Sequence, residues 1–234
     1  MEFSKLSAPT LKELFVKELE SMILSGRLPV GTQLPPEREL AASMQVSRAV
    51  VNTGIKELMR KGFIVVRPRI GAFVADYRRD GTIETFLSIV SYNGGNLRLE
   101  EIRSILELRI ALDTLAVELC AARITDRELS QLREETEQIG SADTAEDAVQ
   151  HAFHFQHHLA LFSGNALLPV IFTSFKSITR TLWLRFCSLY GTSALYENTD
   201  ALCTKLEQRD FEGAVNCLTA SVQNTIQGDK KIYY

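Results

Sequence analysis

Two groups of side chains in this sequence have types and spacings that could do chemistry. The first is a basic run, because residues 47–79 contain eight Lys and Arg side chains against two acidic ones. The second contains all four histidines of the chain, His151, His154, His157 and His158. A basic run is typical of a surface that binds nucleic acid. Two histidines four residues apart on a helix can chelate a metal ion.

The basic run stands out because the whole chain is acidic, with a net charge of −3. Residues 1–80 hold 13 basic and nine acidic side chains, a net charge of +4, which leaves −7 on the remainder. This division predicts a basic N-terminal module that binds a polyanion, joined to an acidic body that does not.

Composition and missing motifs exclude several classes of protein. The 45% hydrophobic and 24% charged residues are typical of a globular chain. There is no apolar run of membrane-spanning length and no secretory signal, so we expect a cytoplasmic protein with no membrane partner. The sequence has no nucleophile elbow, P-loop or G-x-G-x-x-G motif, so we expect no enzyme. The four cysteines have no C-x-x-C spacing, and we expect reduced thiols in the core, at Cys120, Cys187, Cys203 and Cys217.

The elements around the basic run follow a recognisable order. Apolar spacing predicts helices over 11–24 and about 36–44, and a third helix that begins after the N-cap Ser47 and stops at Gly62. Two β-rich segments, 63–67 and 72–75, then flank a hairpin tip. Helix, helix, turn, helix and hairpin is the order of a winged helix-turn-helix.

Beyond the hairpin the sequence is helical throughout. Helices are expected over 99–124, from the Thr125–Glu128 capping box, over 143–161 and 167–189, and in two shorter segments separated at 208–210. The predicted fold is therefore mainly α, with a three-helix winged helix-turn-helix followed by an all-α antiparallel bundle. The expected domains are 1–76 for DNA binding, a linker at 77–82, and 83–234 for effector binding and dimerisation.

Residues 34–74, LPPERELAASMQVSRAVVNTGIKELMRKGFIVVRPRIGAFV, closely resemble the winged-helix signature of the GntR family of bacterial regulators. The rest of the chain resembles the helical C-terminal domain of that family's FadR branch, so the resemblance spans about 8–228. It implies a transcription regulator controlled by a small effector, with repressors commoner than activators. Because one winged helix reads a short half-site, we expect a homodimer on a palindromic operator of double-stranded DNA.

The start of the predicted recognition helix carries small and basic residues, which suit entry into the major groove. Asn52 stands where relatives often have an arginine, so we expect a different operator sequence, with Asn52 reading adenine. Arg38 matches a DNA-contacting position of the family. The hairpin tip adds positive charge, and its glycine permits the protein backbone to approach DNA closely. The candidate DNA-binding residues are Arg38, Ser47, Arg48, Ala49, Asn52, Arg67, Arg69 and Gly71.

Many FadR-branch domains bind a metal through one Asp and three His, and here these positions fall on Ala152, Gln156, Thr199 and Ser221. None of the four is a good ligand, so we expect no metal and no cofactor there. The resemblance also implies that Arg109 and Asp113 stand where the family has an arginine and an acid. Arg109 could bind an effector carboxylate or phosphate, or simply pair with Asp113 on its own helix. An aromatic stripe that includes Phe175, Thr179 and Trp183 is either core or part of the effector pocket. Metal-free acyl-sensing relatives make an acyl-type effector a further alternative.

The histidine cluster should lie away from that pocket, since His151, His154 and His158 point roughly opposite to Ala152 and Gln156 on a helix. We interpret it as a polar outer or dimer-facing surface, with a pH-sensitive contact or an adventitious metal as alternatives. Two other functions remain open from the sequence: a winged-helix protein-interaction module without effector, and an enzyme that uses the 151–158 histidines.

Overall fold

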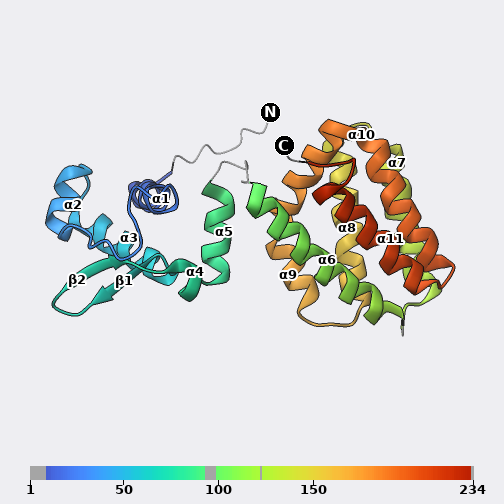
Figure 1. Ribbon diagram of the computed structural model, residues 1–234, viewed down its shortest axis with the longest axis horizontal. Coiled ribbons are helices and arrows are strands. Elements are labelled where there is room, and N and C mark those ends of the chain that lie inside the picture. Colours follow the sequence, from blue (N-terminus) through green and yellow to red (C-terminus); the bar gives the residue numbers. More distant parts are fainter. Residues whose placement is uncertain (1–8, 93–98, 122, 233–234) are drawn as a thin grey trace, which may run out of the picture. The chain divides into compact units, whose positions relative to one another are not determined.

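The structure is a computed structural model that describes residues 9–92, 99–121 and 123–232. The chain forms two compact units, one within residues 1–96 and the other within 97–234 (Figure 1). Both are built mainly from helices, as the sequence predicts. No helix in the described parts of the chain is long and apolar enough to cross a membrane.

The N-terminal unit has the predicted order of helices and hairpin. Its elements are α1 (Leu11–Leu24), α2 (Glu37–Ser43), α3 (Arg48–Arg60), β1 (Ile64–Arg67), β2 (Gly71–Val74), α4 (Tyr77–Asp80) and α5 (Ile83–Tyr92). A capping box between Thr10 and Glu13 begins α1, because it satisfies backbone N–H groups that have no partner inside the helix. The two strands pair antiparallel and place Arg67 opposite Gly71.

Helix α1 packs directly against α3 to form the core of this unit. Phe15, Leu19, Val51 and Leu58 are buried there. Gly54 of α3 faces the ring of Phe15 so closely that a Cβ at this position would lie 2.3 Å from a ring carbon. The position of α3 against α1 therefore depends on a glycine at this crossing.

The boundary between the two units lies at residues 96/97, after the linker expected at 77–82. Residues 77–80 form α4 instead of an open linker, and α5 packs against α1 within the N-terminal unit. The Ser88 hydroxyl donates to the Glu20 carboxylate at 3.1 Å, and the Thr85 hydroxyl donates to the Lys61 carbonyl oxygen. These contacts join residues far apart in sequence, so local charge and glycine content gave no indication of them.

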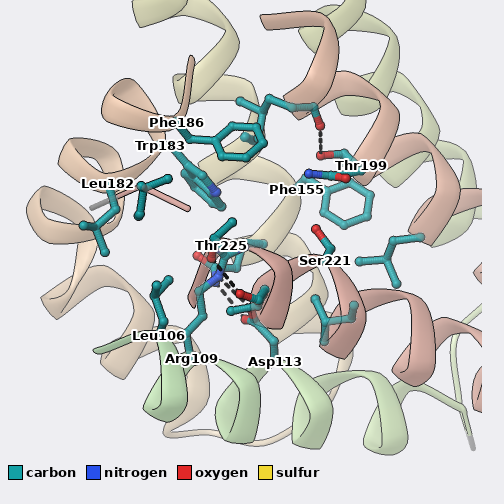
Figure 2. A pocket seen from close by; sticks show the side chains of 18 of the residues that line it. Leu106, Arg109, Asp113, Phe155, Leu182, Trp183, Phe186, Thr199, Ser221 and Thr225 are labelled. Carbon is teal, nitrogen blue, oxygen red and sulfur yellow. Dashed lines mark hydrogen bonds and ion pairs between the residues drawn. The ribbon is translucent and has the colours of Figure 1, made fainter. Parts of the chain in front are cut away.

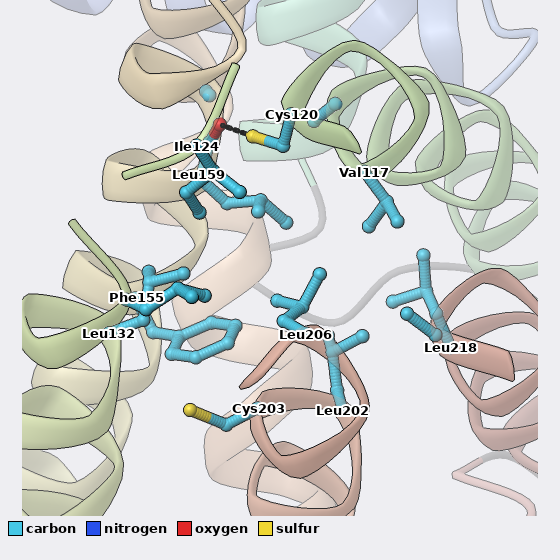
Figure 3. Packing of buried hydrophobic residues seen from close by; sticks show 14 of the residues in the cluster. Val117, Cys120, Ile124, Leu132, Phe155, Leu159, Leu202, Cys203, Leu206 and Leu218 are labelled. Atoms are coloured by element: carbon cyan, nitrogen blue, oxygen red, sulfur yellow. Dashed lines mark hydrogen bonds between the residues drawn. The ribbon is translucent and has the colours of Figure 1, made fainter. Parts of the chain in front are cut away.

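The C-terminal unit is entirely helical in its described residues. It consists of α6 (Leu99–Ala121), α7 (Asp126–Ser141), α8 (Ala145–Phe162), α9 (Leu168–Ser174), α10 (Lys176–Glu207) and α11 (Phe211–Gln227). Side chains from α6, α7, α8, α10 and α11 meet in one hydrophobic core (Figure 3). All four cysteines are free thiols, and burial raises the pKa of Cys120 to about 12, so Cys120 is an unreactive core side chain.

The predicted helix over 167–189 is two helices. The chain breaks at Phe175, between α9 and α10, where no proline or glycine signals a break. Helix α10 then continues to Glu207, with a kink at Gly191, whose φ of 82° is left-handed. The kink separates the long apolar helix from the shorter one expected after it. The predicted Thr125–Glu128 capping box is confirmed at the start of α7.

Candidate functional site

The predicted DNA-reading end of α3 is exposed and well defined. The Ser47 hydroxyl accepts a hydrogen bond from the Val50 N–H at 3.3 Å, so the helix begins at Arg48. Gln45 has a left-handed φ of 53°, which lets the chain reverse sharply between α2 and α3. Ser47, Arg48 and Ala49 are all exposed at the helix N-terminus. An exposed helix N-terminus favours phosphate oxygens and fits the major groove.

Two arginines near this end have no acidic partner. Arg38 on α2 and Arg48 on α3 are exposed, and within the described residues neither forms an ion pair. By contrast, Lys12, Arg60 and Lys61 of the same unit each pair with a glutamate. The guanidinium groups of Arg38 and Arg48 therefore keep their donors for phosphate oxygens or base edges.

Asn52 is held by α2. Its Nδ2 donates to Glu37 Oε1 at 3.1 Å. Bidentate reading of adenine needs both the amide nitrogen and the amide oxygen. The amide nitrogen has two N–H donors, so Asn52 can keep this bond to Glu37 and still offer its second N–H and its oxygen to adenine.

The hairpin presents two basic side chains. The Arg67 guanidinium lies over the Phe73 ring, 4.8 Å from its centroid, which fixes its direction across the pair of strands. Arg69 is exposed at the tip and has a left-handed φ of 64°. Neither forms an ion pair in the described part of the chain. Both charges are thus available to the DNA backbone or minor groove.

Gly71 has an intramolecular reason to be glycine. Its φ is 140°, and a Cβ there would lie 2.8 Å from Nε2 of Gln33. That nitrogen donates to the Ile70 carbonyl oxygen at 2.9 Å, so Gln33 holds the hairpin tip from the preceding loop. Sequence analysis attributed Gly71 to close approach of DNA and missed Gln33, since no local pattern links residues 33 and 70.

In the C-terminal unit, a cavity gathers most of the predicted effector residues (Figure 2). It is lined by residues of α6, α8, α10 and α11. Phe175 and Thr179 lie instead on an adjoining pocket that shares Arg109 and Gln156 with the first. The predicted residues that line the cavity itself are Arg109, Asp113, Ala152, Gln156, Trp183, Thr199 and Ser221.

Sequence analysis missed two polar residues of the cavity wall, Asn198 and Thr225. Thr225 follows the predicted Ser221 by four residues, so helical periodicity alone could have found it. Asn198 directly precedes Thr199, and only the packing of α10 shows that both line the cavity.

A buried polar network lies on the cavity wall. The Asp113 carboxylate accepts from Arg109 Nε at 2.9 Å and from Gln156 Nε2 at 2.7 Å. Burial raises the pKa of Asp113, against the opposing effect of Arg109 and Gln156. The Arg109 guanidinium also lies over the Trp183 ring, 4.6 Å from its centroid. Asp113 and Trp183 together orient Arg109.

Within the described residues, this network leaves the two terminal nitrogens of Arg109 and the Oε1 atom of Gln156 without hydrogen-bond partners. Arg109 bonds Asp113 through Nε, and its two terminal nitrogens have no hydrogen-bond partner in the described residues. The Oε1 atom of Gln156 is buried and also lacks a partner there. Buried polar groups are normally satisfied, so these atoms suit a ligand that offers an anionic oxygen to Arg109 and a hydrogen-bond donor to Gln156.

The cavity does not fit the metal that the FadR-branch resemblance implies. Ala152 has no ligand atom, Gln156 is bonded to Asp113, and the Thr199 hydroxyl donates to the Leu195 carbonyl oxygen at 2.9 Å. The described wall contains one carboxylate, already paired with Arg109, and no histidine. Zinc-type sites need three or four His, Cys or carboxylate ligands.

The histidine cluster lies elsewhere on α8. His151, His154 and His158 lie close to Glu135 of α7, away from the cavity wall. Their side chains are partly buried. The contact with Glu135 could not be inferred from the sequence, because sixteen or more positions separate it from the histidines.

Comparison with known proteins agrees with this arrangement. The family model of bacterial regulatory proteins of the gntR family matches residues 11–74, and the FCD domain model matches residues 104–224. In a solved structure concerning Lar and the Listeria monocytogenes agr system, the fold is similar, with a TM-score of 0.64 at 16% identity over 97% of this chain and all of that one.

Curated relatives are transcription regulators. Mce2R of Mycobacterium tuberculosis is 28% identical over 76% of this chain and 73% of its own length. LutR of Bacillus subtilis is 25% identical over 77% and 84%, and the repressor NanR of Klebsiella aerogenes is 30% identical over 69% and 62%. Such regulators are not enzymes. The chain therefore belongs to the GntR family of transcription regulators, with a helix-turn-helix DNA-binding domain followed by an FCD effector-binding domain.

Proposed function

We propose that this regulator binds a palindromic operator as a homodimer and that a small organic anion in the FCD cavity changes its affinity for that operator. The observation that carries the effector proposal is Arg109, whose terminal nitrogens lack partners on the cavity wall. A carboxylate or phosphate would form charge-assisted, bidentate hydrogen bonds with them. A hydroxyl or amino group on the same molecule would satisfy Gln156 Oε1.

Cavity size favours a compact effector. The volume is about 70 Å³, whereas one water needs roughly 10–15 Å³ on the same measure. Room for about five waters suits a small hydroxy or amino acid. A long acyl chain would require Trp183 or its neighbours to move, so we favour a carboxylate over an acyl-type effector.

The DNA-binding proposal rests on the exposed start of α3 and on four arginines that form no ion pair within the described residues: Arg38, Arg48, Arg67 and Arg69. One recognition helix reads only a short half-site, so two-fold symmetry is needed for a longer operator. A repressor role is supported by the relative NanR, which is a transcriptional repressor.

Two measurements test the proposal. Operator sequences are selected from random duplexes with the full chain and then titrated by fluorescence anisotropy; a palindrome bound at two chains per duplex is expected, and Arg48→Ala should abolish its preference. A non-palindromic site bound by one chain would contradict the dimer proposal.

For the effector, small carboxylic acids are screened by the fluorescence of Trp183, the only tryptophan. An acid that quenches wild type, changes operator affinity and fails with Arg109→Met supports the proposal. Arg127→Met, at an exposed position of α7 outside the cavity lining, is the matched charge control. An effector bound equally by Arg109→Met would show that Arg109 does not hold the anion.

A further inference from the structure

Three histidines of α8 converge on one carboxylate of α7. His151, His154 and His158 follow one another at i, i+3 and i+7, which places them within about 60° on one helix face. The distance to Glu135 Oε2 is 2.7 Å from His151 Nδ1 and 3.6 Å from His154 Nδ1. His158 Nδ1 lies 3.9 Å from the other oxygen, Oε1.

Among the described residues, Glu135 has histidines but no lysine or arginine beside its carboxylate. Its side chain is only 16% exposed, and within the described residues no lysine or arginine pairs with it. A partly buried carboxylate is costly unless a positive group compensates it. The nearby Nδ1 of His158 is itself buried and lacks a hydrogen-bond partner in the same residues. A carboxylate oxygen of Glu135 and the Nδ1 atom of His158 therefore lie next to each other, and both are ligand types that bind divalent cations such as Zn²⁺.

The spacing fits a tetrahedral zinc site. Ligand atoms of Glu135, His151 and His154 can all lie within 4.8 Å of one another. Zinc holds imidazole nitrogen and carboxylate oxygen at about 2.0–2.2 Å, so neighbouring ligand atoms of a tetrahedron lie roughly 3.3–3.5 Å apart. The 3.6 Å distance of His154 needs a small adjustment, and His158, which lies outside this group of three, must move closer to serve as the fourth ligand. The direct His151–Glu135 hydrogen bond must lengthen and lose its proton.

We propose that Glu135, His151 and His154, with His158 as fourth ligand, form a Zn²⁺ site on the outer face of the α7–α8 pair. The site differs from the metal position implied for FadR-branch domains, which falls on the cavity wall at Ala152 and Gln156. It is independent of the effector proposal. Because the ligands come from two helices, the bound ion links α7 to α8 and stabilises the C-terminal unit.

The test uses the full chain, freed of metal with chelator and titrated with Zn²⁺ and, separately, Co²⁺. We expect one ion per chain, the visible absorption of tetrahedral Co²⁺, and a Tm rise of about 5 °C at a hundredfold excess of Zn²⁺ over its Kd. Glu135→Gln keeps a hydrogen-bonding side chain but removes the anion, and His154→Ala removes a ligand. Each should weaken binding at least tenfold.

His157→Ala is the matched control. His157 lies on the same helix, but its Nε2 contacts the Thr173 hydroxyl at 3.2 Å and its ring stacks on Phe153. This variant should bind Zn²⁺ like wild type. Equal weakening by His157→Ala, octahedral Co²⁺ spectra, or binding unchanged in Glu135→Gln would overturn the proposal. So would a chain that binds no Zn²⁺ but whose stability depends on histidine protonation through Glu135, since the cluster would then be a proton-sensitive contact.

Discussion

Removing the Asp113 carboxylate should destabilise the FCD domain by an amount that follows from its contacts. The side chain is 3% exposed and accepts hydrogen bonds from both Arg109 and Gln156. In Asp113→Ala, both donors lose their acceptor. Breaking a buried ion pair from one side costs about 3–5 kcal/mol. Because the Arg109 side chain is 21% exposed and also contacts Trp183, solvent compensates part of the loss, and we expect about 3 kcal/mol.

A double-mutant cycle separates the ion pair from the cavity left by the missing carboxylate. Removing both charges in Arg109→Met/Asp113→Ala should cost less than Asp113→Ala alone, because no buried charge is left unpaired. We expect a coupling energy of about 2 kcal/mol between the two positions. Asp143→Ala is the control, since Asp143 is exposed and should change stability by less than about 0.5 kcal/mol.

Urea unfolding followed by tryptophan fluorescence provides the measurement. Trp183 is the only tryptophan and its ring contacts Arg109, so the signal reports on this domain alone. A loss below about 1 kcal/mol in Asp113→Ala, together with coupling below about 0.5 kcal/mol, would refute the reasoning. It would mean that Asp113 does not hold Arg109 in the folded domain.

Three further outcomes are expected. Gly54→Ala should destabilise the N-terminal unit by about 1–3 kcal/mol, because its Cβ would overlap the Phe15 ring; hydrogen exchange of α1 and α3 amides checks this, and unchanged protection would contradict it. Arg48→Ala should abolish sequence preference, whereas Arg69→Ala should only weaken binding and reduce the salt slope by about one unit; titrations at several salt concentrations would reveal reversed roles. Since burial raises the pKa of Asp113, the folded state holds this proton more tightly than the unfolded state. The contribution of Asp113 to stability should therefore fall as pH rises from about 4 through that raised pKa. In a series of urea unfolding curves, the stability of wild type relative to Asp113→Asn should decline over this range.

Much of the fold could be predicted because its signals are local. Ser47 and Thr125 begin helices through hydrogen bonds to residues three positions ahead, and a left-handed glycine, Gly62, follows the recognition helix. The start of that helix, with Arg48 exposed, follows from the same short-range chemistry. Helical periodicity likewise separated the face of α8 that carries Ala152 and Gln156 from the face that carries the histidines.

Other features depend on residues that are distant in sequence. The packing of α5 with the DNA-binding unit depends on Ser88 reaching Glu20, and the hairpin tip is held by Gln33. The break at Phe175 carries no proline or glycine signal. Such long-range contacts produce no pattern in the local sequence, because the two residues that meet are not close to each other in the chain.

The two sites of the FCD domain show the same division. The sequence was sufficient to name Arg109, Asp113 and Gln156 as cavity residues, because each stands at a position that the resemblance to FadR-branch domains implies. Only the folded domain shows that Asp113 binds the Nε of Arg109 and that the terminal nitrogens of Arg109 have no hydrogen-bond partner among the described residues. Only packing of α7 on α8 brings Glu135 to the histidines. A helix repeat determines which side chains share a face, whereas the partner of that face is set by how the helices pack.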